Sequence, residues 1–165
     1  LQAFDRGVIR RLVHQVLLHP CPRVRRRPQS TVGAVTQQLG AITLLVRDYD
    51  DAIAHYCGDL GFDLLEDTDL GADKRWVRVA PAGSIGACLL LARATSPEQL
   101  AAVGHQTGGR VAFFLQTDDF WRDHARYLEA GVRFLEEPRV EPYGTVAVFQ
   151  DRHGLSWDLI EPTPG

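Results

Sequence analysis

The 165 residues, 45% apolar and 24% charged, suffice for one domain with a real core, and the formal net charge is −3. The three cysteines, Cys21, Cys57 and Cys88, are scattered and odd in number, which argues against a disulfide framework or a structural zinc site. They fit a reducing compartment, so we expect a cytoplasmic protein. No apolar run approaches the ~20 residues of a membrane span, and we expect no membrane partner.

Charge divides the chain near residue 37. Residues 1–37 hold seven arginines and one acid, Asp5, whereas the remainder holds 11 basic and 20 acidic residues. Pro20, Pro22 and Pro28 interrupt any helix in the basic segment. A targeting segment and a basic arm for an anionic partner are alternatives, but we expect a poorly ordered N-terminal extension. The acidic body offers no surface for nucleic acid.

The body begins with an alternating strand from Ala41 and an acidic helix start. Asp48 or Asp50 is expected to cap this helix, because a carboxylate accepts a hydrogen bond from a free N–H of the first turn. Gly61 is typical of a helix C-terminus and precedes another strand. Two further strands are predicted at 75–80 and 85–93, joined by a Pro-Ala-Gly-Ser turn.

After a linker predicted at 94–108, the same pattern returns directly after Arg110 as VAFFLQTDDFWRDHARYLEAGVRFLEE. Asp48 corresponds to Asp118, and Gly61 to Gly131, both 70 positions later. Thr117 or Asp118 is expected to cap the second helix, and strands are predicted directly after Gly131, at 144–150 and at 155–161. The expected buried helix faces are Ala52, Tyr56 and Leu60 in the first half and Phe120, Ala125 and Leu128 in the second.

The repeat predicts the fold class. Each unit reads βαβββ, and a short helix covers only one face of the strands that follow it. We therefore predict one α+β domain over 38–162, with halves 38–93 and 109–162 forming a curled mixed sheet around a cleft.

The stretch Val146–Pro162 contains a carboxylate, Asp158, in a predicted strand that is otherwise largely apolar. In its second strand Trp157 and Leu159 share one face, whereas Ser156 and Asp158 share the other. A carboxylate at the centre of an otherwise apolar strand is costly to bury unpaired. Asp158 therefore marks the place where a functional site is expected.

The segments ITLLVRDYDDAIAHY…LGF, GGRVAFFLQTDDF, EPYGTVAVFQD and HGLSWDLIEP resemble the vicinal oxygen chelate superfamily over about 38–162. That group includes glyoxalase I, bleomycin-resistance proteins and extradiol dioxygenases. The resemblance implies the two-repeat fold. Half-barrels of this kind commonly pair, and an open cleft leaves apolar surface to cover, so we expect a homodimer.

The resemblance also implies where metal ligands would stand. They fall on Ala41, on Arg110, on Asp158 and within Leu89–Leu91. A methyl, a guanidinium and an isobutyl group donate no lone pair to a divalent ion. We therefore expect neither a metal nor another cofactor. A set with shifted ligands, namely His105, Gln106, Asp158 and Glu161, remains an alternative.

The residues expected to bind a ligand share the open cleft. Arg110 is expected opposite Asp158, either to bind an anionic or carbonyl group or as a structural ion pair. The predicted ligand-binding set is Arg110, Asp158, Trp76, Phe114, Tyr143, Phe149 and Thr43, with the aromatic members forming a pocket for a flat ligand. Ordinary sheet packing is the alternative for these aromatic residues. The histidines at 55, 105, 124 and 153 are expected to be surface or packing residues.

The favoured function is a metal-independent small-molecule-binding protein of the bleomycin-resistance type, with an unidentified aromatic or cationic ligand. A metal-dependent glyoxalase-like lyase or dioxygenase with shifted ligands is the alternative, and a structural or regulatory partner with a filled cleft is a third. The sequence assigns no catalytic residue and leaves open whether the chain is an enzyme.

Overall fold

The computed structural model describes residues 38–164, so the basic segment predicted at 1–37 lies outside the described residues. The first half forms a four-stranded mixed sheet of β1 (Ala41–Val46), β2 (Phe62–Asp69), β3 (Arg75–Pro81) and β4 (Cys88–Arg93). The order is β1-β4-β3-β2, with β1 parallel to β4. Its helix α2 (Tyr49–Ile53) continues directly into a π-helix, η1 (Ala54–Asp59).

The second half has the same order of strand, helix and further strands, but its sheet contains five strands because two short ones, β6 and β7, both pair with β8. Its strands are β5 (Val111–Gln116), β6 (Arg133–Phe134), β7 (Arg139–Glu141), β8 (Gly144–Gln150) and β9 (Ser156–Pro162). The order is β5-β9-β8-β6, and β7 also pairs with β8. The helix is α4 (Phe120–Glu129). The strand predicted directly after the second helix is thus replaced by two short strands, β6 and β7.

The connection predicted as a linker at 94–108 contains a further helix, α3 (Pro97–Ala102). Ser96 begins it with a capping box, because its hydroxyl accepts from the Gln99 N–H while the Gln99 side chain accepts from the Ser96 N–H. Sequence analysis missed this helix, although the Ser-Pro-Glu-Gln start carries the signal.

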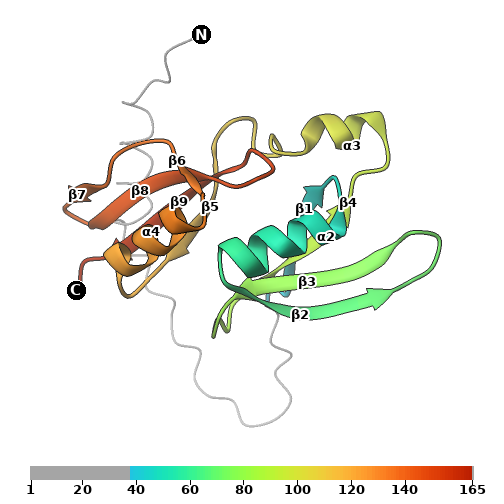
Figure 1. Ribbon diagram of the computed structural model, residues 1–165, viewed down its shortest axis with the longest axis horizontal. Helices are drawn as coiled ribbons and strands as arrows, with labels where there is room; N and C mark the ends of the chain where they lie inside the picture. Colours follow the sequence, from blue (N-terminus) through green and yellow to red (C-terminus); the bar gives the residue numbers. More distant parts are fainter. Residues whose placement is uncertain (1–37, 165) are drawn as a thin grey trace, which may run out of the picture.

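Figure 1 shows α2 and α4 on the same side of the molecule, each in front of its own sheet. The strands form two separate mixed sheets, and the α+β class with its βαβββ repeat is confirmed. The core lies between the helices and the sheet faces they cover. No helix within residues 38–164 combines the length and the apolar character that crossing a bilayer requires.

The helix boundaries follow local side-chain chemistry. Asp48 caps α2 by accepting the Asp51 N–H at 2.9 Å, as predicted. The prediction for the second helix was wrong by one or two positions, because Asp119 is the capping residue and accepts the Arg122 N–H. Gly61 follows the first helical run with a positive φ of 71°, a conformation in which a Cβ would be strained.

The two helices differ in how well their buried faces were predicted. Ala52, Tyr56 and Leu60 are all buried, as expected. In α4 the buried residues are Phe120 and Tyr127, whereas Ala125 and Leu128 are exposed, which corrects the prediction. Residues that share a helix face with Phe120 follow at positions 124 and 127. The predicted residues Ala125 and Leu128 are displaced from this face by one position, so they point toward solvent.

Candidate functional site

Each sheet has a face turned away from its helix, which we call the outer face. Side chains of residues paired across strands point to the same face, so the register defines rows. In the first half Thr43 pairs with Leu90, and Leu90 pairs with Arg78. Arg78 forms an ion pair with Glu66 at 2.9 Å. The charged residues of this row therefore satisfy each other.

The corresponding row of the second half has Asp158 of β9 at its centre. Asp158 pairs with Phe114 of β5 on one side and with Val148 of β8 on the other. Asp158 is 0% exposed, and neither carboxylate oxygen has a hydrogen-bond partner among residues 38–164. Burial raises its pKa from 3.8 to about 6, while the positive charge of Arg139 acts in the opposite direction. Asp158 is thus a carboxyl group for which the described chain provides no donor.

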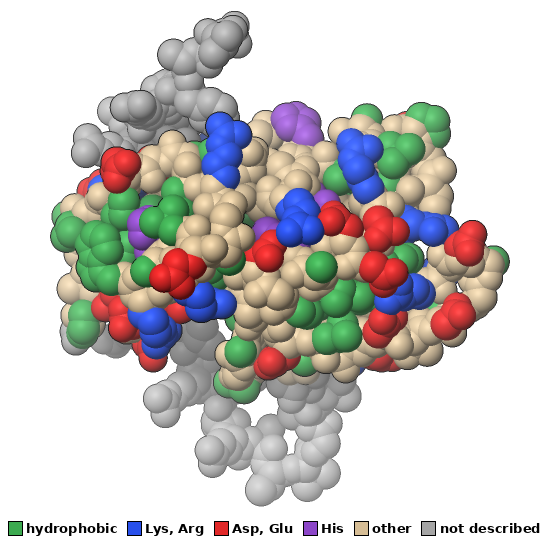
Figure 2. All heavy atoms as spheres, in the orientation of Figure 1, with side chains coloured by type: hydrophobic (Ala, Val, Ile, Leu, Met, Phe, Trp, Pro, Cys, Tyr) green, Lys and Arg blue, Asp and Glu red, His purple; other side chains and the backbone are tan. Residues whose placement is uncertain are grey.

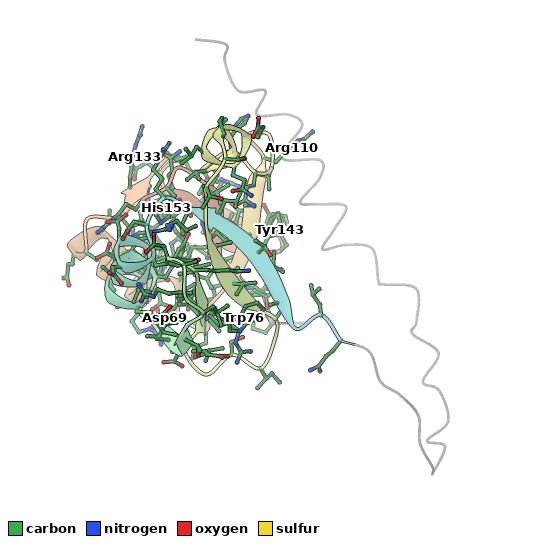
Figure 3. The ribbon with its side chains drawn as sticks, turned by 90° about the vertical axis from the view of Figure 1, so that its right-hand side faces the viewer. Asp69, Trp76, Arg110, Arg133, Tyr143 and His153 are labelled. Carbon is green, nitrogen blue, oxygen red and sulfur yellow. The ribbon has the colours of Figure 1, made fainter. Side chains whose placement is uncertain are left out.

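Several residues of the predicted ligand set lie on the outer face. Thr43 is exposed, Trp76 is 39% exposed and Phe114 is 52% exposed. Tyr143, in the turn before β8, is close enough that the charge of Asp158 contributes to raising its pKa, after the larger effect of burial. Figure 3 shows Trp76 and Tyr143 on the side of the molecule away from the helices.

Arg110 does not pair with Asp158, contrary to the prediction. The parallel register of β5 and β9 places Phe114 beside Asp158, and the exposed Arg110 precedes the strand. The cation that acts on Asp158 is instead Arg139, brought in by the pairing of β7 with β8. Arg139 itself contacts Glu136. Sequence analysis missed Arg139 because it did not predict β7.

Phe149 is also misplaced in the predicted set. It is 0% exposed and packs in the core against Trp157, with ring centroids 5.9 Å apart. Its neighbour Val148 shares the row of Asp158, and successive residues of a strand point to opposite faces. The alternation of β8, together with the pairing of Val148 with Asp158, excludes Phe149 from the outer face.

The outer face does not supply a metal-ligand set. The Gln106 side chain bonds to the backbone of β1, because its oxygen accepts the Leu45 N–H at 2.7 Å. Glu161 accepts the Phe120 N–H at the start of α4 at 2.8 Å, and strand alternation places Glu161 on the face opposite to Asp158. Within residues 38–164 no three His, Cys, Asp or Glu side chains gather as metal ligands would. The shifted-ligand alternative is therefore not assembled, and the residues present do not fit a divalent ion.

A polar seam joins the two halves on the helix side. His55 in η1 lies 2.8 Å from Asp59 through Nδ1, and its Nε2 accepts the Arg152 N–H at 3.2 Å. This pattern describes a neutral ring with its proton on Nδ1. The Arg152 guanidinium donates to Asp51 and Asp59, both at 2.8 Å. These bonds tie η1 to the turn between β8 and β9.

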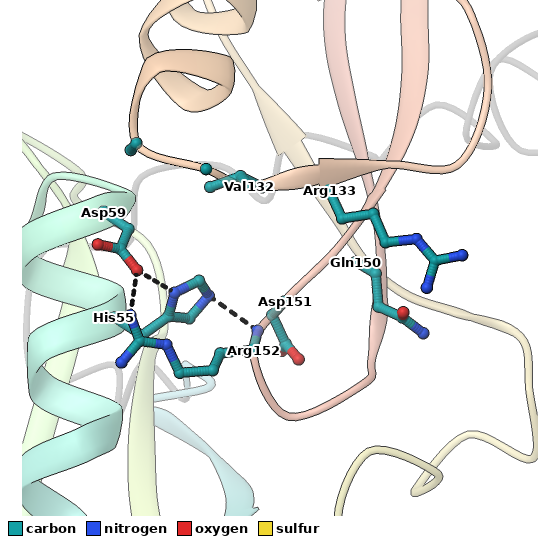
Figure 4. A pocket seen from close by; sticks show the side chains of 9 residues that line it. His55, Asp59, Val132, Arg133, Gln150, Asp151 and Arg152 are labelled. Atoms are coloured by element: carbon teal, nitrogen blue, oxygen red, sulfur yellow. Dashed lines mark hydrogen bonds and ion pairs between the residues drawn. The ribbon is translucent and has the colours of Figure 1, made fainter.

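The seam borders a hollow of ≈ 190 Å³, drawn in Figure 4. His55, Asp59 and Arg152 bond to one another on one side, and the ends of Arg133 and Gln150 point away from the hollow on the other. A second hollow of ≈ 410 Å³ lies beside the start of α2 and is lined by Arg75, Arg93 and several aspartates. Neither hollow includes Asp158. The seam is therefore a structural contact between the halves.

Two repeated βαβββ units, each with a helix on one face of its sheet, define a vicinal oxygen chelate fold. The model of the Glyoxalase/Bleomycin resistance protein/Dioxygenase superfamily matches residues 38–159. The chain belongs to this superfamily, which confirms the resemblance seen in the sequence.

Relatives with known sequences or structures cover the same region. An uncharacterized protein from Shewanella frigidimarina (strain NCIMB 400) is 53% identical over 126 residues, covering 76% of this chain and 93% of that protein. The crystal structure of UcmS2 is 28% identical with a TM-score of 0.67, covering 76% and 98% of the two chains. TnmS3, an antibiotic binding protein from Streptomyces sp. CB03234, is 31% identical with a TM-score of 0.62, covering 80% and 100%.

Proposed function

We propose that this protein binds a small molecule without a metal ion, in the manner of a bleomycin-resistance protein, and that Asp158 anchors the ligand. The observation that carries the proposal is a completely buried carboxyl group with no hydrogen-bond donor among the described residues. The side chains around it do not complete a metal-ligand set. The missing partner is therefore a hydrogen-bond donor or cation that a ligand brings.

The rest of the outer face supports an aromatic ligand. Phe114 lies directly beside Asp158 in the sheet and is half exposed, and Tyr143 lies near the same carboxylate. Aromatic rings next to a single charged group favour a flat cation, because the rings provide contact area and the carboxylate provides orientation. Since Asp158 is enclosed, the side chains around it must move when the ligand enters.

The comparison with TnmS3 supports a binding role, because that protein is described as antibiotic binding and shares 31% of its residues with this chain. The superfamily itself contains both binding proteins and enzymes. The choice between a binding protein and an enzyme depends here on the side chains around Asp158, where the described residues gather no group of three or more metal-ligating side chains.

Isothermal titration calorimetry with bleomycin and a panel of flat aromatic amines tests this proposal. We expect micromolar or tighter binding of at least one compound, and a loss of about tenfold or more in Asp158→Asn, since the amide that replaces the carboxylate carries no charge to strengthen the contact with a cationic donor. Asp73→Asn is the matched control, because Asp73 is an exposed aspartate in the turn between β2 and β3, in the other half of the chain. Absence of binding by every compound would contradict the proposal.

Elemental analysis of protein purified without chelator separates the metal-dependent alternative. We expect much less than one equivalent of any transition metal. One equivalent of Ni, Zn, Fe or Mn that is lost in Asp158→Ala would overturn the proposal and favour a lyase or dioxygenase.

A further inference from the structure

Three arginines of this chain each contact two carboxylates. Residues 38–165 hold 20 acidic and 11 basic side chains, and Figure 2 shows basic side chains directly beside acidic ones on the helix side of the molecule. The arginines with two carboxylate partners are Arg75, Arg122 and Arg152. In so acidic a body, an arginine that lies near a further carboxylate is not thereby free to bind it.

Arg139 follows this pattern on the outer face. It pairs with Val146 of β8, and Val146 pairs with Ile160 of β9. Ile160 is two positions from Asp158, so Arg139 and Asp158 project from the same face of the sheet. The positive charge of Arg139 lowers the pKa of Asp158 against the larger effect of burial, yet neither Asp158 oxygen accepts a hydrogen bond from the described residues. The guanidinium is thus close to this carboxylate but donates elsewhere.

Two glutamates occupy the Arg139 guanidinium. Its Nη1 contacts the Glu136 carboxylate, and its Nε lies 3.3 Å from a carboxylate oxygen of Glu141. Glu136 is fixed in addition by the Val148 N–H of β8, which it accepts at 3.1 Å. Arg139 is 28% exposed and Glu141 is 17% exposed, so their attraction is less screened by water than that of a surface pair. Turning Arg139 toward Asp158 would remove it from both glutamates.

Tyr143, at the turn between β7 and β8, lies beside the same charged groups. Burial raises its pKa, Arg139 opposes this shift, and the charges of Glu141 and Asp158 add to it. Arg139, Glu141 and Asp158 therefore surround one tyrosine. The two carboxylates that compete for the arginine are neighbours, and only the one in β7 is bonded to it.

We propose that Glu141, supported by Glu136, is a positioning residue for ligand binding, which holds Arg139 away from Asp158 and so keeps this carboxylate vacant for the ligand. The role in binding rests on the proposed function, whereas the position of the arginine does not. Without the glutamate, the guanidinium turns to Asp158, forms a charge-assisted pair and closes the site. Three carboxylates around one guanidinium also select the ligand, because they favour a molecule that brings a positive charge.

Carboxyl NMR titration of the full chain without ligand tests where Arg139 is held. Glu141→Gln should lower the pKa of Asp158 from about 6 toward its ordinary value of 3.8, because an adjacent arginine favours the ionised form. Loss of the Glu141 charge alone has a smaller effect of the same sign, so the substitution is repeated in an Arg139→Gln background, where we expect little change. Glu137→Gln is the matched control, because Glu137 is an exposed glutamate of the β6–β7 connection whose charge acts on His124.

Calorimetry with a flat aromatic amine that binds the natural chain tests the consequence for the ligand. Glu141→Gln should weaken binding about tenfold, because the vacant form of Asp158 becomes the minor one. The double variant Arg139→Gln/Glu141→Gln should restore binding, since the competing guanidinium is gone. Glu136→Gln should act in the same direction as Glu141→Gln, and it takes the place of that variant if thermal unfolding shows that Glu141→Gln does not fold.

The two measurements separate the possible failures. An equal fall in the pKa of Asp158 with and without Arg139 would overturn the proposal, and so would unchanged or tighter binding in Glu141→Gln. If no compound binds the natural chain, the proposed function fails, but the comparison of pKa values still decides whether Glu141 holds the arginine.

Discussion

Asp151 and Asp158 are two buried aspartates of one hairpin, with 4% and 0% exposure, and their surroundings are opposite. Asp151, in the turn after β8, accepts hydrogen bonds from the Tyr56 hydroxyl at 2.7 Å and the Trp157 indole at 3.0 Å. It also accepts the N–H groups of His153 and Leu155, both at 2.9 Å. Asp158, in β9, accepts none from the described residues.

The contrast separates a structural carboxylate from a functional one. Asp151 lies on the helix side, where the Tyr56 hydroxyl connects η1 to the second half and three further donors come from the same hairpin, so its charge stabilises the folded chain. Asp158 lies on the outer face, where burial without a donor costs stability. The same residue type therefore gives opposite predictions on the two sides of the sheet.

The largest expected effect comes from Asp151. Asp151→Ala leaves four donors without their acceptor, two of them buried side chains, and should lower the free energy of unfolding by about 3–5 kcal/mol. Urea unfolding followed by circular dichroism measures this loss. Asp151→Asn is the control with nearly the same shape and should lose less, because its amide oxygen still accepts. A loss of under about 1 kcal/mol in the alanine variant would show that Asp151 does not hold the halves together.

Asp158→Asn should change stability in the opposite direction. The raised folded-state pKa of about 6 means that the folded chain releases the proton less readily than the unfolded chain. The cost is therefore absent below about pH 4, grows as pH rises and is complete above about pH 6. The variant should be more stable than the natural chain by on the order of 2–3 kcal/mol at about pH 8.

The same variant should lose this advantage near pH 3, where Asp158 is largely protonated in both the folded and the unfolded state. Urea unfolding at both pH values measures the difference. If Asp158→Asn were instead destabilised at pH 8, the carboxylate would have a cationic partner that residues 38–164 do not show.

A smaller change in unfolding free energy is expected when Tyr56 or Tyr143 is replaced by phenylalanine. Tyr56→Phe removes one buried hydrogen bond to Asp151 and should cost about 1–2 kcal/mol of unfolding free energy. Tyr143→Phe, beside the outer face, should change stability by less than about 0.5 kcal/mol because Tyr143 gives Asp158 no hydrogen bond. Equal losses in thermal or urea unfolding would remove the distinction between the two sides.

The smallest expected effect is a change in the pKa of Asp158, which should differ between variants of Arg139 and Arg110. Arg139→Ala should raise the pKa of Asp158 further, because the arginine charge now lowers it. Arg110→Ala should leave that pKa unchanged, since Arg110 precedes the strand next to Asp158. Carboxyl NMR titration measures both. A shift in the Arg110 variant would support the ion pair expected from the sequence.

Local patterns were sufficient for much of the fold. The period of the first helix identified Ala52, Tyr56 and Leu60 as buried, and the alternation of the last strand placed Asp158 on the face opposite Trp157. These predictions succeed because side-chain direction in a helix or strand depends on neighbouring residues alone. Counting the second helix through Ala125 failed, because both of its apolar faces fit a helical period.

Partners across strands were harder to predict. Arg139 reaches the surroundings of Asp158 through the pairing of β7 with β8, in which Arg139 stands opposite Val146. Arg110 is kept from Asp158 by the register of β5 and β9. Register depends on packing between segments distant in the chain, so a short strand such as β7 leaves little local signal.

The sequence by itself determined the repeated βαβββ unit, the superfamily and the outward direction of Asp158, because these follow from period and motif. Only the tertiary structure decided that Asp151 is fully bonded and Asp158 is not. Both are aspartates followed within a few residues by apolar side chains, and their difference arises from which donors the fold brings to each carboxylate. Hydrogen bonding depends on distances between elements, which the order of residues does not contain.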